Sequence, residues 1–237
     1  KYLLFLENAF PYMDNYNYHK GMNGIIQELT GLLKTKNIGT DSDRALLLDF
    51  QATLETKPEK AIKLEKDALA QIETITADNA RLVSNLHANL GGLYRMNGHP
   101  DLAREHMEKS ISLLDQFNLL HINDSIPQIA NYAMFLTEQQ EPERGISELQ
   151  KLSGIIKEYH SDDCLDYAKV QETLGTIYLM TANLPQAKTH FKRAFKIYEK
   201  IWADEPEMIE AKYQEIQELY PQIGFCIGKN LSGLLTK

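Results

Sequence analysis

The chain has 237 residues, of which 43% are hydrophobic and 24% are charged, so it is long and apolar enough to fold around a sizeable core. Its 25 lysines and arginines are outnumbered by 33 aspartates and glutamates, which gives a formal net charge of −8 at pH 7. Nucleic-acid binding needs a clustered positive face, and no run of lysines and arginines supplies one. We therefore expect no nucleic-acid partner.

Membrane insertion and secretion are also not expected. No stretch of about 18 apolar residues occurs, and the segment from Lys1 to Phe10 lacks the three regions of a signal peptide. The two cysteines, Cys164 and Cys226, are too far apart for a zinc-binding pair and are expected to be free thiols. These features predict a soluble, cytoplasmic protein with no metal and no cofactor.

In chain order, the first element predicted is a degenerate helix pair over residues 1–40. Its helices are expected at Leu3 to Phe10 and at Tyr18 to Leu33. The sequence Gly39-Thr40-Asp41 marks the break before the regular part of the chain.

A repeat of 42 residues follows. Pro58, Pro100 and Pro142 are spaced at this interval, and each is followed directly by an acidic residue. Proline at the first helical position and a carboxylate at the positive end of the helix dipole are typical of a helix start. Asp78, Asp162 and Asp204 lie near the starts of other helices, where an aspartate can cap the free amides.

Small residues recur with the same period. Three residues after each of these prolines comes a small residue: Ala61, Ala103 and Gly145. One period later comes Ala187. Small residues are expected where two helices must approach closely. The period predicts repeats over 41–77, 78–119, 120–161 and 162–203, with eight helices and turns near 55–58, 97–100, 139–142 and 182–185. Two capping helices are expected over 204–237, at Glu207 to Tyr220 and at Gln222 to Leu235.

The spacing of small and large residues resembles that of tetratricopeptide repeat proteins. The run Leu90-Gly91-Gly92-Leu93-Tyr94 and the later run Leu174-Gly175-Thr176-Ile177-Tyr178 carry the resemblance, each with an alanine at the matching place in the next helix. A 42-residue period is similar to that of kinesin light chains and of the sensor arms of bacterial signalling ATPases. The resemblance implies an all-α fold, a single α-α superhelix (TPR-like α-solenoid) of antiparallel helix pairs.

The resemblance also implies a concave groove that is lined by the first helix of each repeat and binds a peptide or a partner helix. Asn89, Asn131 and Thr173 occupy equivalent positions two residues before the small residue of their helices, and an asparagine can both donate to and accept from a peptide backbone. An equally open alternative is that the asparagines only bond neighbouring helices. The other residues expected in the groove are Asn85, Arg95, Met96, Met134, Lys169, Glu172 and Met180.

No catalytic constellation is found, so the protein is not expected to be an enzyme. His87 is interpreted as a structural histidine, and the loop with His160, Asp162 and Cys164 as a capped helix start rather than a metal site. The leading hypothesis is a scaffold for a protein or peptide ligand. The alternative is a peptide-sensing regulatory arm of a larger bacterial signalling ATPase or transcription regulator. The oligomeric state is not indicated by the sequence.

Overall fold

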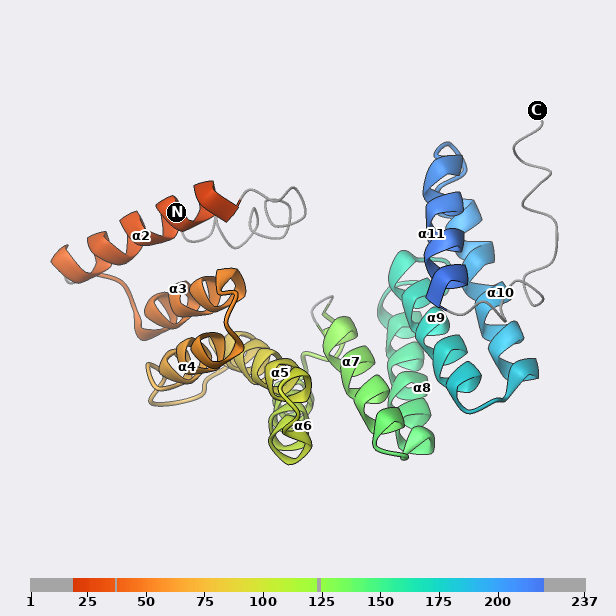
Figure 1. Cartoon of the computed structure of the whole chain (residues 1–237), viewed down its shortest axis with the longest axis horizontal. Helices are drawn as coiled ribbons and strands as arrows, with labels where there is room; N and C mark the ends of the chain where they lie inside the picture. The colour runs from red at the N-terminus through yellow and green to blue at the C-terminus, as the bar shows by residue number, and fades with distance from the viewer. Residues whose placement is uncertain (1–18, 37, 123–124, 220–237) are drawn as a thin grey trace. The chain divides into compact units, whose positions relative to one another are not determined.

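The computed structural model describes residues 19–36, 38–122 and 125–219, and the regular structure in these ranges is entirely helical (Figure 1). Ten helices are present there: α2 (His19–Lys36), α3 (Asp41–Leu54), α4 (Pro58–Leu69), α5 (Ala80–Met96), α6 (Pro100–Gln116), α7 (Ser125–Glu138), α8 (Pro142–Tyr159), α9 (Leu165–Met180), α10 (Leu184–Ile201) and α11 (Pro206–Leu219). The eight helices predicted between Asp41 and Ala203 are confirmed as α3 to α10. The helices predicted at Leu3 to Phe10 and at Gln222 to Leu235 lie outside the described residues.

The chain divides into two compact units, Lys1–Leu119 and Leu120–Lys237. Unit 1 contains α2 to α6, and its main packing pairs are α3 with α4 and α5 with α6. Unit 2 contains α7 to α11, with α7 against α8 and α9 against α10. Each of these four pairs is one two-helix repeat.

Three of the four repeats turn between their helices in the same way. Gly98, Gln140 and Ala182, which are 42 residues apart, adopt left-handed backbone conformations with φ of 75°, 65° and 59°. The next amide bonds a carbonyl five residues back in each case: His99 to Tyr94 at 2.9 Å, Glu141 to Leu136 at 2.8 Å and Asn183 to Tyr178 at 2.7 Å. This is the Schellman pattern, which satisfies carbonyls at the end of the first helix.

The predicted proline starts are confirmed for α4, α6 and α8, but the predicted aspartate caps at Asp78 and Asp162 are wrong. The N-cap residue of α5 is Asn79, one residue after Asp78, and that of α9 is Cys164, two residues after Asp162. The Cys164 sulfur accepts a hydrogen bond from the amide of Tyr167 at 3.4 Å, and Asp162 instead lies 3.9 Å from the Lys157 ammonium. A capped helix start is therefore present in this loop, with the cysteine as the cap.

Small residues hold the two helices of a repeat close together. A Cβ atom at Gly91 would lie 3.3 Å from the carbonyl oxygen of Ala103, which is itself fully buried. A Cβ atom at Gly145 would lie 2.6 Å from the carbonyl oxygen of Ala133. The periodic small residues thus mark the backbone contacts between α5 and α6 and between α7 and α8.

Candidate functional site

The predicted groove residues fall into two groups, one on each compact unit. Asn85, Asn89, Arg95 and Met96 lie on α5 of unit 1, while the remaining six lie on α7 and α9 of unit 2. Because α7 packs against α9, the first helices of the last two repeats are direct neighbours. Asn131 and Thr173, the equivalent residues of these two repeats, therefore belong to adjacent helices.

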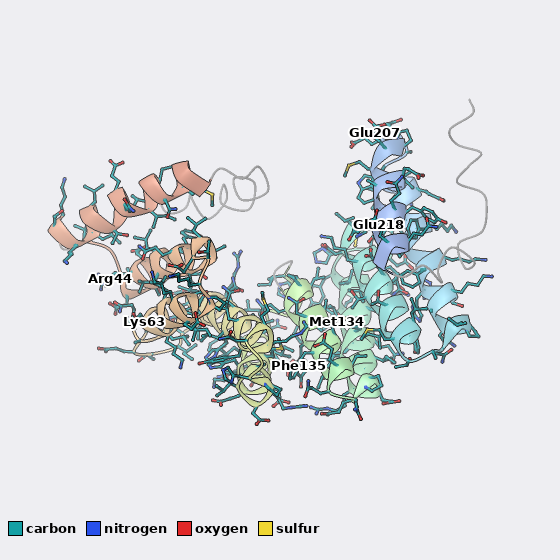
Figure 2. All side chains as sticks on the ribbon, viewed as in Figure 1. Arg44, Lys63, Met134, Phe135, Glu207 and Glu218 are labelled. Carbon is teal, nitrogen blue, oxygen red and sulfur yellow. The ribbon has the colours of Figure 1, made fainter. Side chains whose placement is uncertain are left out.

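On α7, Asn131 and Met134 lie one helical turn apart. The Asn131 side chain is exposed, and it forms no hydrogen bond with another residue in the described ranges. Met134 is half-buried beside the fully buried Phe135; Figure 2 labels both methionine and phenylalanine on this helix. An exposed amide next to an adaptable thioether is suited to contact with a polypeptide.

On α9, two of the predicted residues have partners within their own helix. The Thr173 hydroxyl donates to the carbonyl oxygen of Lys169 at 3.0 Å, and the Lys169 ammonium lies 3.8 Å from the Asp166 carboxylate. Both ionic groups are near the surface, so this pair contributes little to stability. Met180, at the end of the helix, is 44% exposed.

Glu172 connects three helices of unit 2. One of its carboxylate oxygens accepts a hydrogen bond from the Tyr198 hydroxyl of α10 at 2.6 Å, and the other lies 3.0 Å from the Lys212 ammonium of α11. Burial lowers the pKa of Lys212, but the Glu172 and Glu215 carboxylates outweigh it and raise the pKa above its usual value. Burial and the Glu172 carboxylate also raise the pKa of Tyr198. Both oxygens of Glu172 are therefore used to hold α9, α10 and α11 together.

In unit 1, Asn89 belongs to a polar cluster that reaches into the core. Its amide nitrogen donates to the Asp49 carboxylate at 2.8 Å and to the Glu65 carboxylate at 3.2 Å. Glu65 stands at a position that is apolar in the other repeats and is only 2% exposed. The alternative expectation, that Asn89 bonds to neighbouring helices, therefore holds for its side-chain nitrogen, which bonds to residues of α3 and α4.

Burial, and then the neighbouring Asp49 charge, raise the pKa of Glu65 well above its usual range, and burial also raises the pKa of Asp49. One Glu65 oxygen, Oε2, is buried and has no hydrogen-bond partner within the described part of the chain. A neutral carboxyl group costs less to bury than a carboxylate, so Glu65 holds its proton at neutral pH.

The last three predicted residues lie along α5. Asn85 and Arg95 are half-buried, and both interact with other residues of the protein. Met96 is 82% exposed at the end of the helix, in the place that Met180 occupies at the end of α9. The exposed methionines recur 84 residues apart, at equivalent positions of the second and fourth repeats.

His87 is not part of this surface. Its Nδ1 atom lies 2.8 Å from Nδ1 of His106 on α6, which agrees with its interpretation as a structural histidine. Burial, and then the charges of His106 and Lys109, lower the pKa of His87 to about 4. No cluster of three or more metal-ligating side chains occurs among the residues that the structure describes. None of the described helices is both long and apolar enough to cross a membrane.

These helix pairs define a helical repeat protein, and comparison with known proteins identifies the kind of repeat. Residues 125–200 match the family model described as tetratricopeptide repeat. No curated protein matches the chain. The predicted fold class, an all-α solenoid of the TPR-like type, is confirmed by the family match and by the solved structures with this fold.

Three solved structures illustrate the likeness. The TPR-like repeats of a Podosopora anserina protein described as kinesin light chain superpose with a TM-score of 0.63 at 14% identity, over 82% of this chain and 93% of that chain. BtubC (BKLC) from P. vanneervenii gives a TM-score of 0.62 at 19% identity, over 77% and 72% of the two chains. MamA gives 0.53 at 15% identity, over 79% and 94%. At these identities the likeness concerns the fold.

Proposed function

We propose that this chain is a protein-interaction module that binds an extended peptide or a partner helix on the face formed by the first helices of its repeats. Tetratricopeptide repeats and the kinesin light chain repeats support a scaffold of this kind, and they are generally not catalytic. In unit 2 the binding face comprises α7 and α9, with Asn131, Met134, Lys169, Thr173 and Met180 as contact residues.

The exposed Asn131 side chain is the observation that carries the proposal. It offers a donor and an acceptor on a surface where the neighbouring polar groups, Thr173 and Glu172, already have partners inside the fold. An amide in this position can bond one peptide group of an extended ligand, while Met134 supplies an apolar contact beside it. The role of Glu172 is then to hold α9 against α11 and so to keep the face in shape.

Unit 1 offers a second face on α5, with Asn85, Asn89, Arg95 and Met96. The two hydrogen bonds of Asn89 use only its nitrogen, which leaves its Oδ1 atom as the group to accept from a peptide amide. Replacing Asn89 also disturbs the cluster with Asp49 and Glu65, so Asn131 is the cleaner position for a test.

The test begins with affinity capture from the native lysate and mass spectrometry to obtain a bound segment as a synthetic peptide. In calorimetric titrations Asn131→Ala should weaken the binding of this peptide by about 1 kcal/mol or more, because one peptide group of the ligand loses its hydrogen bond. Glu207→Ala is the control, since this exposed residue lies at one end of α11, with Glu218 near the other (Figure 2). If wild type and Asn131→Ala bound the peptide equally well, the binding site would not lie on this face.

A further inference from the structure

A crevice in unit 2 lies between α8 and α10, with α9 as its floor. Two adjoining hollows of about 340 Å³ and about 220 Å³ form it, and both are lined by Lys157, Tyr167 and Arg193. We call this feature the α8–α10 crevice. None of the predicted groove residues lines it.

The floor of the crevice is built around a buried glutamine. Gln171 is 1% exposed, and its Oε1 atom accepts hydrogen bonds from Nδ1 of His190 at 2.9 Å and from Nη1 of Arg193 at 3.3 Å. Its nitrogen donates to the Ser153 hydroxyl of α8 at 3.3 Å. The guanidinium of Arg193 is therefore held by a side chain that cannot move freely, and four of its five N–H donors do not take part in this bond.

The crevice carries more positive than negative charge. Arg193, Lys196 and Lys200 lie three and four residues apart on one face of α10. Lys200 pairs with Asp163, and Lys157 lies 3.9 Å from Asp162. Within the described part of the chain, neither Arg193 nor Lys196 has a carboxylate within ion-pair distance, although Lys196, after Lys200, helps to lower the pKa of Asp163. These two cations form a positive site in a protein whose net charge is −8.

Unit 1 contains the same framework with less positive charge. Its hollow between α5 and α6 is lined by His87, His106 and Lys109, which stand 84 residues before Gln171, His190 and Arg193. The histidine stacks on a tyrosine in both units: Tyr94 on His106 with 5.4 Å between ring centroids, and Tyr178 on His190 with 5.3 Å.

The surrounding residues differ between the two units. Where unit 2 has Lys192 and Lys196, unit 1 has Glu108 and Ser112, and where unit 2 has Lys157, unit 1 has Glu73. The packing of the repeat therefore does not require cations at these positions. Their presence in unit 2 points to a ligand.

We propose that the α8–α10 crevice is a second interaction surface, which binds an acidic segment of a partner protein. Arg193 and Lys196 bind its carboxylates, and Lys157, whose ammonium lies 5.2 Å from the centroid of the buried Tyr167 ring, borders the same crevice. The net charge of −8 opposes the long phosphate backbone of a nucleic acid more than it opposes a short acidic peptide, which can stay within the crevice. This surface does not depend on the groove proposed above.

The probe is a short fluorescein-labelled peptide of glutamates, titrated with the whole chain at low salt and followed by fluorescence anisotropy. Saturable binding is expected, and Arg193→Glu combined with Lys196→Glu should weaken it by about tenfold or more, because attraction between partly exposed charges becomes repulsion. Lys196→Glu alone should weaken it in the same direction. The ammonium of Lys196 has no hydrogen bond in the described structure, so this single variant keeps the fold if the double variant does not.

Two matched controls make the same change of charge elsewhere. Lys188→Glu reverses an exposed lysine of α10 that does not line the crevice, and Lys109→Glu reverses the equivalent of Arg193 in unit 1. Both should stay within about twofold of wild type, and so should Asn131→Ala in the proposed groove. Absence of saturable binding, an equal loss in Lys188→Glu, or tighter binding of a single-stranded oligonucleotide than of the peptide would each overturn the proposal.

Discussion

His87 and His106 face each other through Nδ1 atoms only 2.8 Å apart, so one ring must donate the shared proton and the other must accept it. We infer the direction of this hydrogen bond from the equivalent pair in unit 2. There His190, the counterpart of His106, meets the Oε1 atom of Gln171, which can only accept. By this correspondence His106 donates, and the neutral ring of His87 accepts.

This arrangement predicts that His87→Gln makes unit 1 less sensitive to acid. Because burial lowers the pKa of His87 to about 4, its contribution to stability is complete above the ordinary histidine pKa and is lost as the pH falls from about 6.5 toward about 4. The variant keeps the acceptor but cannot be protonated. Its free energy of unfolding should match wild type at pH 7.5 and exceed it by about 1–2 kcal/mol at pH 5.

Urea denaturation at the two pH values measures this difference. His99→Gln, at an exposed turn residue, is the control and should show no such gain at pH 5. If His87→Gln were as acid-sensitive as wild type, protonation of His87 would not be what destabilises unit 1 at low pH.

For Glu65 we expect stability to depend on pH in the opposite direction. Its pKa is raised in the folded state, so its stabilising contribution is complete below the ordinary carboxyl pKa and is lost as the pH rises toward the raised value. Glu65→Gln keeps the shape but removes the ionisation. The stability of the variant relative to wild type should therefore increase by about 1 kcal/mol or more between pH 5 and pH 8.

Chemical denaturation across this range tests the prediction, with Glu59→Gln on the exposed part of α4 as the matched change. A constant difference between Glu65→Gln and wild type at all pH values would show that Glu65 does not hold its proton in the folded protein.

Substitution by alanine should have opposite effects on stability at two glycines of α8. A Cβ atom at Gly145 would lie 2.6 Å from a carbonyl oxygen of α7, and backbone cannot move aside cheaply, whereas Gly154 has no atom within 4 Å of its Cβ position. Gly145→Ala should destabilise by about 1–3 kcal/mol. Gly154→Ala should stabilise by about 0.5–1 kcal/mol through helix propensity. Thermal unfolding that moves in the same direction for both would contradict the α7–α8 contact.

The ion pair of Lys212 with Glu172 should contribute to the stability of α11 in the fold. Lys212→Met removes the ion pair with Glu172 while keeping an apolar side chain, and should cost about 1–2 kcal/mol because the carboxylate is mostly buried. Hydrogen exchange of the α11 amides should become faster. Lys200→Met breaks an exposed pair with Asp163 and should leave both stability and exchange nearly unchanged.

Much of the fold could be predicted from local signals. The starts of α4, α6 and α8 are marked by proline, and the α7–α8 contact is marked by Gly145, because these features depend on residues close in the sequence. The partners of Asn89 could not be predicted in this way, since Asp49 and Glu65 are 40 and 24 residues distant. One signal was present: a glutamate at a position that is apolar in the other repeats.

The cations of α10 were missed for a different reason. A positive face was sought as a run of adjacent residues, but Arg193, Lys196 and Lys200 are brought together only by the helical period. The helix itself was predicted correctly. Placing its charged residues on the faces of that helix would have shown that these three cations lie together. In the described part of the chain Lys200 pairs with Asp163, whereas Arg193 and Lys196 have no carboxylate within ion-pair distance. This difference depends on the packing of α8 and α9, which no local pattern specifies.

The two tyrosine–histidine stacks also concern the ancestry of the chain. Tyr94 with His106 and Tyr178 with His190 recur at twice the basic period, while the first and third repeats have Ala52 with Leu64 and Leu136 with Glu148 at these positions. An alternating difference of this kind is what duplication of a two-repeat block would leave. The heritable element is then a block of four helices, and each compact unit carries one copy, in which the region around the shared stack has since diverged.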